Sequence, residues 1–382
     1  MTNMPDTERS DVVVIGAGQA GLAAAYHLRR QGIDYRVLEA DTRVGDVWRR
    51  RYDSLLLYSP ARFDSLPGMR FPLPGHAYPT GGQMADYLES YAEQFELRVE
   101  TGLRVDGVRL PDDSADPYVV TAGERRFEAR HVVVATGAFM RPRVPAFASE
   151  LDPSIRQLHS SDYRNPAQLA DGPVLVVGFS HSGADLAHEI AATHPTILSG
   201  KAHGQLPFSV DSRRGRIAWP IMKRVAWHLL TLDTPIGRKM APAVRMGGAP
   251  LLRWRRDDLM RRGVELAEAR TVGVKDGKPV LADGRVLDVS SVVWCTGFDT
   301  DHGWISPPIE REDGWPVQRR GIAPTPGLYF LGLLFQYGFS SMLILGAGRD
   351  AQYVVDRVAE RVRDGGRGGE RVAGLAGGLE GA

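Results

Sequence analysis

The apolar positions near the N-terminus form an unbroken run rather than an alternating pattern. Residues 11–15 (DVVVI) predict a strand, 21–30 (GLAAAYHLRR) predict a helix, and 35–39 (YRVLE) predict a second strand. Continuous apolar strands are typical of parallel sheets that are covered on both faces. The pattern therefore predicts a β-α-β unit of the usual size.

The same order of elements begins again near residue 173. Residues 173–177 predict a strand, 183–192 a helix and 196–198 a further strand, with a turn rich in glycine and serine after the first of them. Such alternation is typical of doubly wound α/β sheets. We therefore expect an α/β fold with two Rossmann-like dinucleotide-binding domains.

Further segments extend the two units. The helices expected at 84–96 and 348–362 and the strands at 130–135, 290–294 and 328–331 complete the list. Because the strands at 130–135 and 290–294 both lead into Thr-Gly, we place both in one domain. The prediction is a first domain of residues 10–150 and 290–362, a second domain of residues 151–289 inserted into it, and a disordered glycine-rich tail at 363–382.

The composition is that of an ordinary globular protein. The 382 residues are 43% hydrophobic and 24% charged, and the net charge of +1 gives no reason to expect nucleic acid as a partner. The polar N-terminus does not resemble a signal peptide, and no apolar run approaches the ~20 residues that span a bilayer. With one cysteine, Cys295, no disulfide forms within the chain. We expect a cytoplasmic protein.

The first glycine turn has the spacing G-x-G-x-x-G, with glycines at Gly16, Gly18 and Gly21. It lies between a predicted strand and a predicted helix, which is the context in which this motif binds a pyrophosphate. Glu39 ends the next strand, 23 residues after Gly16. An acidic residue there binds a ribose 2′-hydroxyl and repels a 2′-phosphate. The first site therefore favours FAD or NAD.

The second turn, Gly178 to Gly183, keeps the outer glycines but has Ser180 in the middle. Lys201 follows Gly178 by 23 residues, the offset that separates Glu39 from Gly16. A cation at this place suits the 2′-phosphate of NADPH, and we expect Ser199 to contribute. The alternative interpretation is a solvated loop lysine. Two dinucleotides in one chain indicate electron transfer from a nicotinamide to a flavin.

With these motifs in place, the chain resembles the flavin-containing monooxygenases and their bacterial and plant relatives, including the YUCCA enzymes. The resemblance runs from residue 11 to about 362 and rests on residues 45–48 (GDVW), 78–80 (YPT), 135–137 (ATG) and 295–298 (CTGF). It implies that NADPH reduces FAD, that O₂ adds to the flavin C4a, and that the resulting hydroperoxide oxidises a small organic substrate. No side-chain nucleophile is needed.

The residues expected to bind the cofactors lie in the two turns, at the strand ends and in the Thr-Gly linkers. They are Gly16, Gly18, Gln19, Ala20, Gly21, Glu39, Ala40, Asp46, Val47, Trp48, Val105, Ala135, Thr136, Gly137, Gly178, Ser180, Ser182, Gly183, Ser199, Lys201, Thr296, Gly297 and Phe298.

No catalytic residue is identified by a motif. Chain position alone suggests a substrate pocket of Tyr58, Ser59, Gln336 and Tyr337, where the family often has an asparagine near Tyr58. The family signature F-x-G-x-x-x-H-x-x-x-[FY] retains only its last two positions, His159 and Tyr163, and we expect His159 to be a structural residue between the domains.

Several alternatives remain open. The histidines lack partners at ligand spacing, so no metal site is expected, and a disulfide reductase is excluded because it needs a second cysteine. A non-oxygenating oxidoreductase that passes electrons from NADPH to a quinone, O₂ or a partner protein remains the second candidate. Oxygenation of a heteroatom and Baeyer–Villiger oxidation also both stay open. We expect the basic and aromatic segment 213–232 to cover the active-site cleft or form a homodimer face, rather than to bind a membrane.

Overall fold

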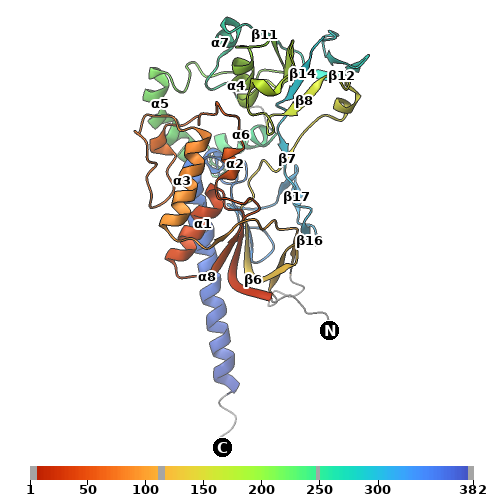
Figure 1. Ribbon diagram of the computed structural model, residues 1–382. Coiled ribbons are helices and arrows are strands. Elements are labelled where there is room, and N and C mark those ends of the chain that lie inside the picture. The colour runs from red at the N-terminus through yellow and green to blue at the C-terminus, as the bar shows by residue number, and fades with distance from the viewer. Residues whose placement is uncertain (1–6, 111–116, 247–249, 377–382) are drawn as a thin grey trace, which may run out of the picture.

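The two predicted units form two separate sheets in the computed structural model, which describes residues 7–110, 117–246 and 250–376. The first sheet, with helices α1, α3 and α8 beside it, makes the lower part of the molecule in Figure 1, and the second sheet lies in the upper part. The predicted α/β class is therefore confirmed.

The first sheet has eight strands in the order β16-β4-β5-β6-β1-β2-β3, with β19 also pairing with β6. Ile15 at the end of β1 lies between Leu38 of β2 and Val134 of β6, all in parallel register. The strand bounds are β1 (Thr7–Ile15), β2 (Tyr35–Leu38), β3 (Val99–Glu100), β4 (Gly107–Arg109), β5 (Tyr118–Ala122), β6 (Arg125–Val134), β16 (Ile305–Ser306) and β19 (Leu328–Phe330).

The unbroken apolar run in β1 is explained by cover on both faces of this sheet. Val12 and Val14 pack against α1 (Gln19–Arg30), α3 (Gly81–Gln94) and α8 (Ile344–Ala376), whereas Val13 and Ile15 pack on the other face with β4 and β5. All four side chains are at most 4% exposed. Each such burial stabilises the fold by roughly 1.5–3 kcal/mol.

The second sheet contains five parallel strands in the order β11-β10-β9-β14-β8. The strand bounds are β8 (Arg156–His159), β9 (Val174–Val177), β10 (Thr196–Ser199), β11 (Val264–Ala267) and β14 (Ser291–Trp294). On one face, α4 (His181–Ile190) and α7 (Arg256–Arg261) cover the sheet. The whole sheet comes from residues 156–294, between the segments that build the first sheet.

The predicted domain boundary at residue 290 is wrong by one strand. β14 pairs with β8 and β9, so residues 291–294 belong to the second sheet. The two similar segments that end in Ala135-Thr136-Gly137 and Cys295-Thr296-Gly297 therefore belong to different sheets, and not to one domain as predicted. β6 lies beside β1 as β14 lies beside β9, so each is the returning strand of its own unit.

The C-terminal helix also differs from the prediction. α8 begins at Ile344, four residues before the predicted start, and its backbone is helical to Ala376, within the range expected to be a tail, whereas residues 377–382 lie outside the described residues. Glycine weakens a helix by about 1 kcal/mol per residue relative to alanine, but it does not block the hydrogen bonds of the backbone.

Segment 213–232 forms α5 (Arg213–Arg224) and the π-helix η4 (Val225–Leu229), which α6 (Pro235–Arg245) follows. It packs on the loop after β19: Phe339 N donates to Leu230 O at 2.8 Å, and Leu232 N donates to Tyr337 O at 2.8 Å. The remaining elements are α2 (Asp46–Arg49), η1 (Ala61–Phe63), η2 (Ala146–Glu150), η3 (Pro166–Gln168), η5 (Phe339–Met342), β7 (Arg141–Pro142), β12 (Thr271–Lys275), β13 (Lys278–Leu281), β15 (Phe298–Asp299), β17 (Arg311–Glu312) and β18 (Trp315–Pro316).

Candidate cofactor-binding site

The glycine turn after β1 is shaped by two close backbone contacts and one open position. Gly16 has φ of +101°, and a Cβ on it would lie 2.7 Å from the Ala135 carbonyl oxygen. A Cβ on Gly21 would lie 1.9 Å from the Gly16 carbonyl oxygen. At Gly18 no atom lies within 4 Å of that position, and no side chain caps α1 there. The uncapped N–H groups fit the pyrophosphate of a dinucleotide.

Glu39 lies beside this turn. Its carboxylate accepts hydrogen bonds from Ala17 N at 2.6 Å and Asp41 N at 2.9 Å. The negative charge therefore stays fixed at the end of β2, where it suits a ribose hydroxyl and disfavours a 2′-phosphate. Of the neighbouring predicted residues, Gln19 and Ala20 open α1 and Ala40 follows Glu39.

The turn after β9 repeats the construction of the first. Gly178 has φ of +119°, and a Cβ on it would lie 2.2 Å from the Cys295 carbonyl oxygen. A Cβ on Gly183 would lie 1.7 Å from the Gly178 carbonyl oxygen. Ser180 stands at the N-cap of α4 with φ of −132°, which any residue adopts, so serine is tolerated there. Ser182 lies in the first turn of α4, and these residues fit a second dinucleotide.

Of the two residues expected to read the 2′-phosphate, one is placed unsuitably. Ser199 is fully buried, and its hydroxyl shares a hydrogen bond of 2.8 Å with Thr271 Oγ1, so its side chain does not face a ligand. Lys201 is exposed and follows Gly200, whose φ of +143° turns the chain away from β10. Lys201 is therefore exposed just after β10, whereas the side chain of Ser199, the last residue of that strand, lies in the interior.

Arg256, a residue that the sequence analysis missed, lies near the second turn. Its guanidinium is 5.8 Å from the ring centroid of Phe179, which belongs to the turn, and it forms an ion pair with Glu268. No fixed spacing from the glycine motif could have identified it, because α7 starts 78 residues after Gly178. Arg256 offers a second cation for a phosphate.

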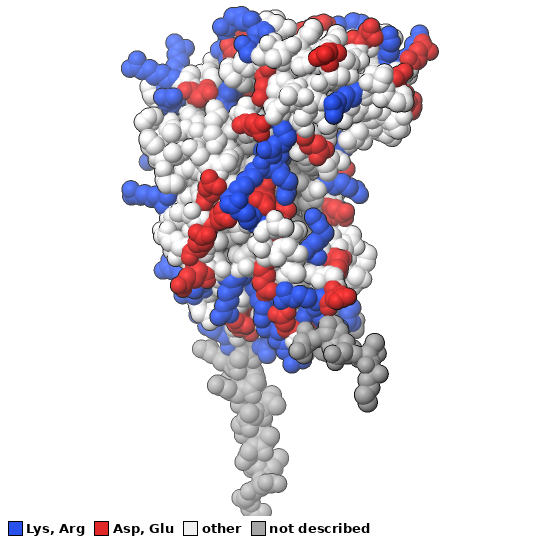
Figure 2. All heavy atoms as spheres, in the orientation of Figure 1, with Lys and Arg blue, Asp and Glu red and all other residues white. Residues whose placement is uncertain are grey.

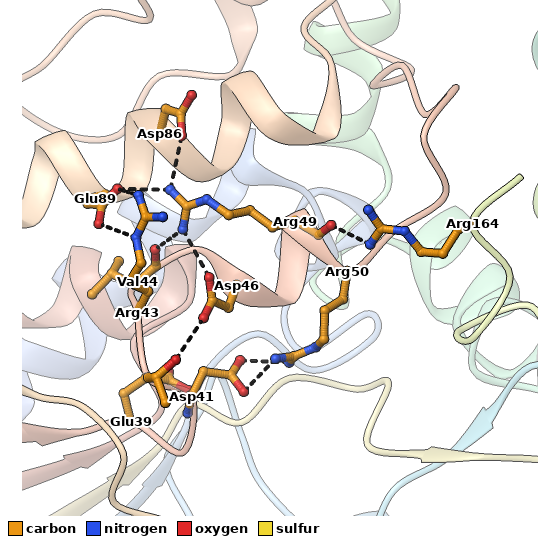
Figure 3. Close-up of polar contacts among 11 residues, drawn as sticks. Glu39, Asp41, Arg43, Val44, Asp46, Arg49, Arg50, Asp86, Glu89 and Arg164 are labelled. Carbon is orange, nitrogen blue, oxygen red and sulfur yellow. Dashed lines mark hydrogen bonds and ion pairs between the residues drawn. The ribbon is translucent and has the colours of Figure 1, made fainter.

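The segment from Gly45 to Trp48 forms α2 against α3. A Cβ on Gly45 would lie 2.6 Å from the Ala85 carbonyl oxygen, so this glycine allows the two helices to touch. Asp46 pairs with Arg49 at 3.1 Å, and Arg49 also pairs with Glu89 at 2.8 Å (Figure 3). Basic and acidic side chains lie next to one another over the middle of the face shown in Figure 2. The Asp46 side chain therefore serves this network, which does not support the predicted contact to a cofactor.

Three other predicted residues differ in exposure. Trp48 is half-buried and packs against the cores of both sheets, whereas the Val47 side chain is exposed. Val105 packs half-buried against the outer face of the first sheet. Trp48 is thus the member of the GDVW segment that connects the two units.

The two Thr-Gly linkers run side by side between the sheets, because β7 and β15 pair with each other. Thr136 donates to Met140 Sδ at 3.7 Å, and Thr296 donates to the Arg143 carbonyl. Gly137 and Gly297 have φ of +78° and +84°, which allows each linker to turn sharply. The predicted linker residues, including Ala135 and Phe298, therefore meet at the junction of the two units.

His159 ties the second sheet to this junction. Its Nε2 lies 3.1 Å from the Gly297 carbonyl oxygen, and its ring centroid is 4.9 Å from that of Phe298. Burial lowers the pKa of His159, so the neutral form is favoured. Tyr163 is buried and donates to Glu189. Both residues make structural contacts.

The four residues predicted to line a substrate pocket make different polar contacts. Tyr58 donates to Asp185 at 2.7 Å, and Ser59 donates to Asp64 at 2.5 Å. Tyr337 donates to Asp233 at 2.9 Å. Gln336 is fully buried after β19, and its Nε2 lacks a partner among the described residues. Gln336 therefore retains an unused donor, whereas each of the other three hydroxyls donates to a carboxylate.

A buried polar cluster, also missed from the sequence, joins the two units. Asp185 of α4 accepts from the hydroxyls of Tyr52 and Tyr58, and Arg253 NH1 lies 3.6 Å from the same carboxylate oxygen. Arg253 also donates to the carbonyl of Leu57 at 2.8 Å. Burial raises the pKa of Asp185 and, strongly, that of the Tyr58 hydroxyl, so Tyr58 remains a hydrogen-bond donor at neutral pH.

Asp64 is a second buried carboxyl group in the same loop. It is 1% exposed, its Oδ2 has no partner among the described residues, and its Oδ1 accepts a hydrogen bond from Ser59. Burial raises the pKa of Asp64 to about 7, despite the opposing effect of that hydrogen bond. A group that titrates near neutral pH can carry a proton in a reaction.

Two kinds of feature are absent from the described residues. Residues 7–110, 117–246 and 250–376 contain no helix that is long and apolar enough to cross a bilayer. Over the same residues no three His, Cys, Asp or Glu side chains are grouped so as to hold a metal ion.

Comparison with known proteins gives a consistent result. Residues 13–203 match the family described as pyridine nucleotide-disulphide oxidoreductase. An uncharacterized oxidoreductase CzcO-like from Geobacillus kaustophilus is 37% identical over 91% of this chain and 98% of its own length. The probable indole-3-pyruvate monooxygenase YUCCA9 of Arabidopsis thaliana is 34% identical over 92% of this chain and 89% of its own length.

Solved structures agree with these relatives. The flavin-containing monooxygenase from Stenotrophomonas maltophilia has a TM-score of 0.76 at 26% identity and covers 93% of this chain and all of that chain. Cyclohexanone monooxygenase, at 18% identity and a TM-score of 0.68, shares the fold.

The relatives and the two glycine turns lead to the same conclusion. Disulfide chemistry lacks its second cysteine here, and burial raises the pKa of the Cys295 thiol to about 12, which keeps it unreactive. The predictions of an enzyme and of FAD and NADPH as its cofactors are confirmed at the level of the family. The chain belongs to the flavin-containing monooxygenase-like family of flavin-dependent oxidoreductases.

Proposed function

We propose that the protein is a monooxygenase that consumes NADPH and oxidises a small organic substrate with O₂. FAD binds at the first glycine turn and NADPH at the second. One observation carries this assignment: the two turns have the same construction, but Glu39 follows the first and Lys201 the second at equal offsets. Opposite charges at matching places select different adenosine riboses.

The proposal divides the chain into functional domains. Residues 10–150 and about 295–362 bind FAD, and the inserted residues from 151 to about 294 bind NADPH. The adjacent β7 and β15 linkers hold the two domains at a short distance from each other. We also propose that the protein works in the cytoplasm, because its one cysteine and lack of disulfides suit a reducing compartment.

The protein's own residues bind, orient and shield the cofactors. The uncapped N-termini of α1 and α4 hold the two pyrophosphates, and the buried contacts of Tyr52, Tyr58 and Asp185 close the junction against water. Gln336, with its unused amide donor, is positioned at the carboxyl end of the first sheet, where ligands bind in such folds. Bound FAD supplies the electron transfer to O₂ that side chains cannot perform.

The non-oxygenating reductase remains the second candidate, and Tyr58 favours it. The loop near Tyr58 lacks the asparagine that the resemblance leads us to expect there, and the Tyr58 hydroxyl is already bonded to Asp185. The relative named above is described as acting on indole-3-pyruvate, a small keto acid, which supports oxygenation.

The stoichiometry of the reaction separates the two candidates. Purified protein should be yellow, should oxidise NADPH faster than NADH, and with its substrate should form about one oxidised product per NADPH. Hydrogen peroxide equal to the NADPH consumed, without any oxidised product over a panel of small acids, amines and ketones, would identify the reductase.

Lys201→Glu tests the nucleotide assignment directly. Losing one charge-assisted contact to the 2′-phosphate costs about 1.5–3 kcal/mol, so the preference of kcat/KM for NADPH over NADH should fall about 10- to 100-fold. Lys275→Glu, in the β12 strand, is the control and should retain the preference. If Lys201→Glu left the preference for NADPH unchanged, Lys201 would not be the residue that contacts the 2′-phosphate, and Arg256 would become the candidate.

A further inference from the structure

His181 is the first residue of α4 and belongs to the glycine turn that follows β9. Its ring centroid lies 5.1 Å from that of Tyr58, in the loop that follows the first unit. Asp185, one helical turn further along α4, accepts a hydrogen bond from the Tyr58 hydroxyl at 2.7 Å. Since residues four apart lie on the same face of a helix, His181 and Asp185 both face the first unit.

The protein satisfies these two side chains to different degrees. The Asp185 carboxylate accepts from the hydroxyls of Tyr52 and Tyr58 and lies beside the Arg253 guanidinium. The Nε2 atom of His181 is buried as well, but it has no hydrogen-bond partner among the described residues. Buried polar atoms are rarely left unpaired in native proteins, because the loss of their hydrogen bonds to water costs free energy. This atom is therefore a candidate contact for a bound ligand.

The tautomer of His181 decides what kind of group can pair with it. The imidazole forms a hydrogen bond with the backbone of Pro250. Because proline has no N–H, the ring donates to the Pro250 carbonyl oxygen, and the donor is Nδ1, since Nε2 is unpaired. Burial lowers the pKa of His181 to about 4, which keeps the ring neutral at neutral pH. Nε2 then carries a lone pair, so its partner must be an N–H or O–H group.

NADPH, bound as proposed above, has donors of this kind. Its pyrophosphate is assigned to the turn from Gly178 to Gly183, and its adenosine half to Lys201 after β10. The nicotinamide half extends toward the first unit, since the flavin that it reduces binds there. The donors on that half are the amide N–H groups of the nicotinamide and the hydroxyls of its ribose.

We propose that His181 binds the nicotinamide half of NADPH, with Nε2 accepting a hydrogen bond from its amide or from its ribose. The contact holds this half of the cofactor on the face of α4 that Tyr58 also contacts, whereas Lys201 acts on the adenosine half. This inference rests on the proposed function, because it assigns a further residue to the NADPH site.

The binding of two ligands to the oxidised, flavin-loaded protein tests this assignment without turnover. NADP⁺ contains both halves of the cofactor, whereas adenosine 2′,5′-bisphosphate contains the adenosine half alone. Calorimetric titration gives the dissociation constant of each ligand. A residue that contacts the nicotinamide half should affect NADP⁺ and leave the bisphosphate unchanged.

His181→Phe and His181→Gln form a matched pair of variants. Both lose the bond to Pro250, and only glutamine can place an amide oxygen near the position of Nε2, so the difference between them isolates that acceptor. We expect His181→Phe to bind NADP⁺ about 10-fold more weakly than the parent, and His181→Gln to stay within about 3-fold, because only phenylalanine leaves the ligand's donor unpaired. Both variants should bind the bisphosphate within about 2-fold of the parent, whereas Lys201→Glu should weaken both ligands about 10-fold or more.

The 3-acetylpyridine analogue of NADP⁺, which lacks the amide N–H groups, identifies the donor. If His181→Phe binds this analogue as tightly as the parent does, the donor is the amide. If His181→Phe binds the analogue more weakly than the parent does, the donor is a ribose hydroxyl.

Three results would overturn the assignment of His181. One is equal NADP⁺ affinity in the parent and His181→Phe. The second is an equal loss of NADP⁺ and bisphosphate affinity in His181→Phe, which would mean that the residue only maintains the shape of the turn. The third is an equal loss of NADP⁺ affinity in His181→Phe and His181→Gln. A parent protein that binds neither ligand would overturn the NADPH site itself, and His181 with it, so the two failures are distinguishable.

Discussion

The three glycines of the first turn have different roles although they belong to one motif. Gly16 and Gly21 are required by the protein's own backbone, since a methyl group on either would meet a carbonyl oxygen at 2.7 Å or less. Gly18 is required by nothing in the protein, and the space above it remains open. The position that the protein leaves open is the one available to a phosphate.

Gly18→Ala and Gly21→Ala should therefore fail in different ways. We expect the free energy of unfolding of Gly18→Ala to lie within about 1 kcal/mol of the parent's, because the φ of −72° at Gly18 suits alanine. The variant should bind FAD at least 10-fold more weakly. Gly21→Ala should lose several kcal/mol of stability or fail to fold. Urea unfolding of the flavin-free protein and FAD titration measure both effects. Equal FAD affinity in Gly18→Ala and the parent would contradict the assignment of this turn.

Asp64 should make stability depend on pH. Burial raises its pKa from 3.8 to about 7, so the folded state binds the proton more tightly than the unfolded state does. The stability due to this group is then greatest below pH 4, is lost between pH 4 and 7, and stays low above pH 7. The difference amounts to roughly 4 kcal/mol.

Asp64→Asn tests this expectation, because asparagine still accepts the hydrogen bond from Ser59 but does not ionise. Urea unfolding at pH 5 and pH 8 should show a smaller fall in stability for the variant than for the parent. Asp171→Asn, at an exposed aspartate, is the control. A variant with the parent's pH dependence would show that Asp64 does not carry it.

At the scale of elements, arginines and aromatic rings hold the helices after residue 213 to the first unit. The Arg349 guanidinium lies 4.4 Å from the Trp227 centroid and 4.7 Å from the Tyr337 centroid, and Arg320 lies 4.0 Å from Tyr337 and 3.8 Å from Tyr353. This stack joins η4, the loop after β19 and α8. It explains why the segment expected to cover the cleft packs where it does.

Arg349→Met should loosen this stack. Methionine fills much of the volume but removes the charge and leaves Asp350, which is 4% exposed, without its ion pair. An unpaired buried charge costs about 3–5 kcal/mol. Hydrogen exchange should show faster opening of residues 225–245, whereas Arg357→Met, whose ion pair with Glu360 is half-exposed, should cost less than about 1 kcal/mol. Equal protection in both variants would contradict the role of the stack.

At the scale of the whole molecule, the two sheets are coupled by buried polar contacts as well as by the linkers. Arg253 is 5% exposed and reaches Asp185, Asp211 and two carbonyls of the segment that follows the first unit. Arg164 also crosses between the units, pairing with Asp53 and the Arg49 carbonyl, but its side chain is 41% exposed. Removing Arg253 should therefore cost more stability than removing Arg164, because it leaves buried polar groups without their partner.

Arg253→Met should uncouple the units. We expect calorimetric unfolding to separate into two transitions with a total loss of about 3–5 kcal/mol, because Asp185 stays buried without its cation and the carbonyls of Leu56 and Leu57 lose their donor. Arg164→Met should lose less than about 1 kcal/mol and keep the parent's profile. A single transition in Arg253→Met, at the parent's temperature, would mean that the linkers alone couple the units.

The sequence by itself determined the two β-α-β units, both glycine turns and the opposite charges after them. These features follow from local spacing: a buried parallel strand must be apolar throughout, and a turn that contacts backbone on one side and phosphate on the other must be glycine. The sequence also excluded disulfide chemistry, because Cys295 is a single cysteine and a disulfide within the chain needs two.

Only the tertiary structure decided which contacts form between residues that are far apart in the chain. The strand 291–294 has the composition of a strand in either sheet, and pairing with β9 assigned it to the second. Ser199 has the right position for a phosphate contact, yet Thr271, 72 residues away, takes its hydroxyl. The Asp185 cluster joins segments from different units, and Arg256 meets Phe179 across 77 residues of the second unit. No local pattern specifies such contacts, because they depend on how the packed elements face each other.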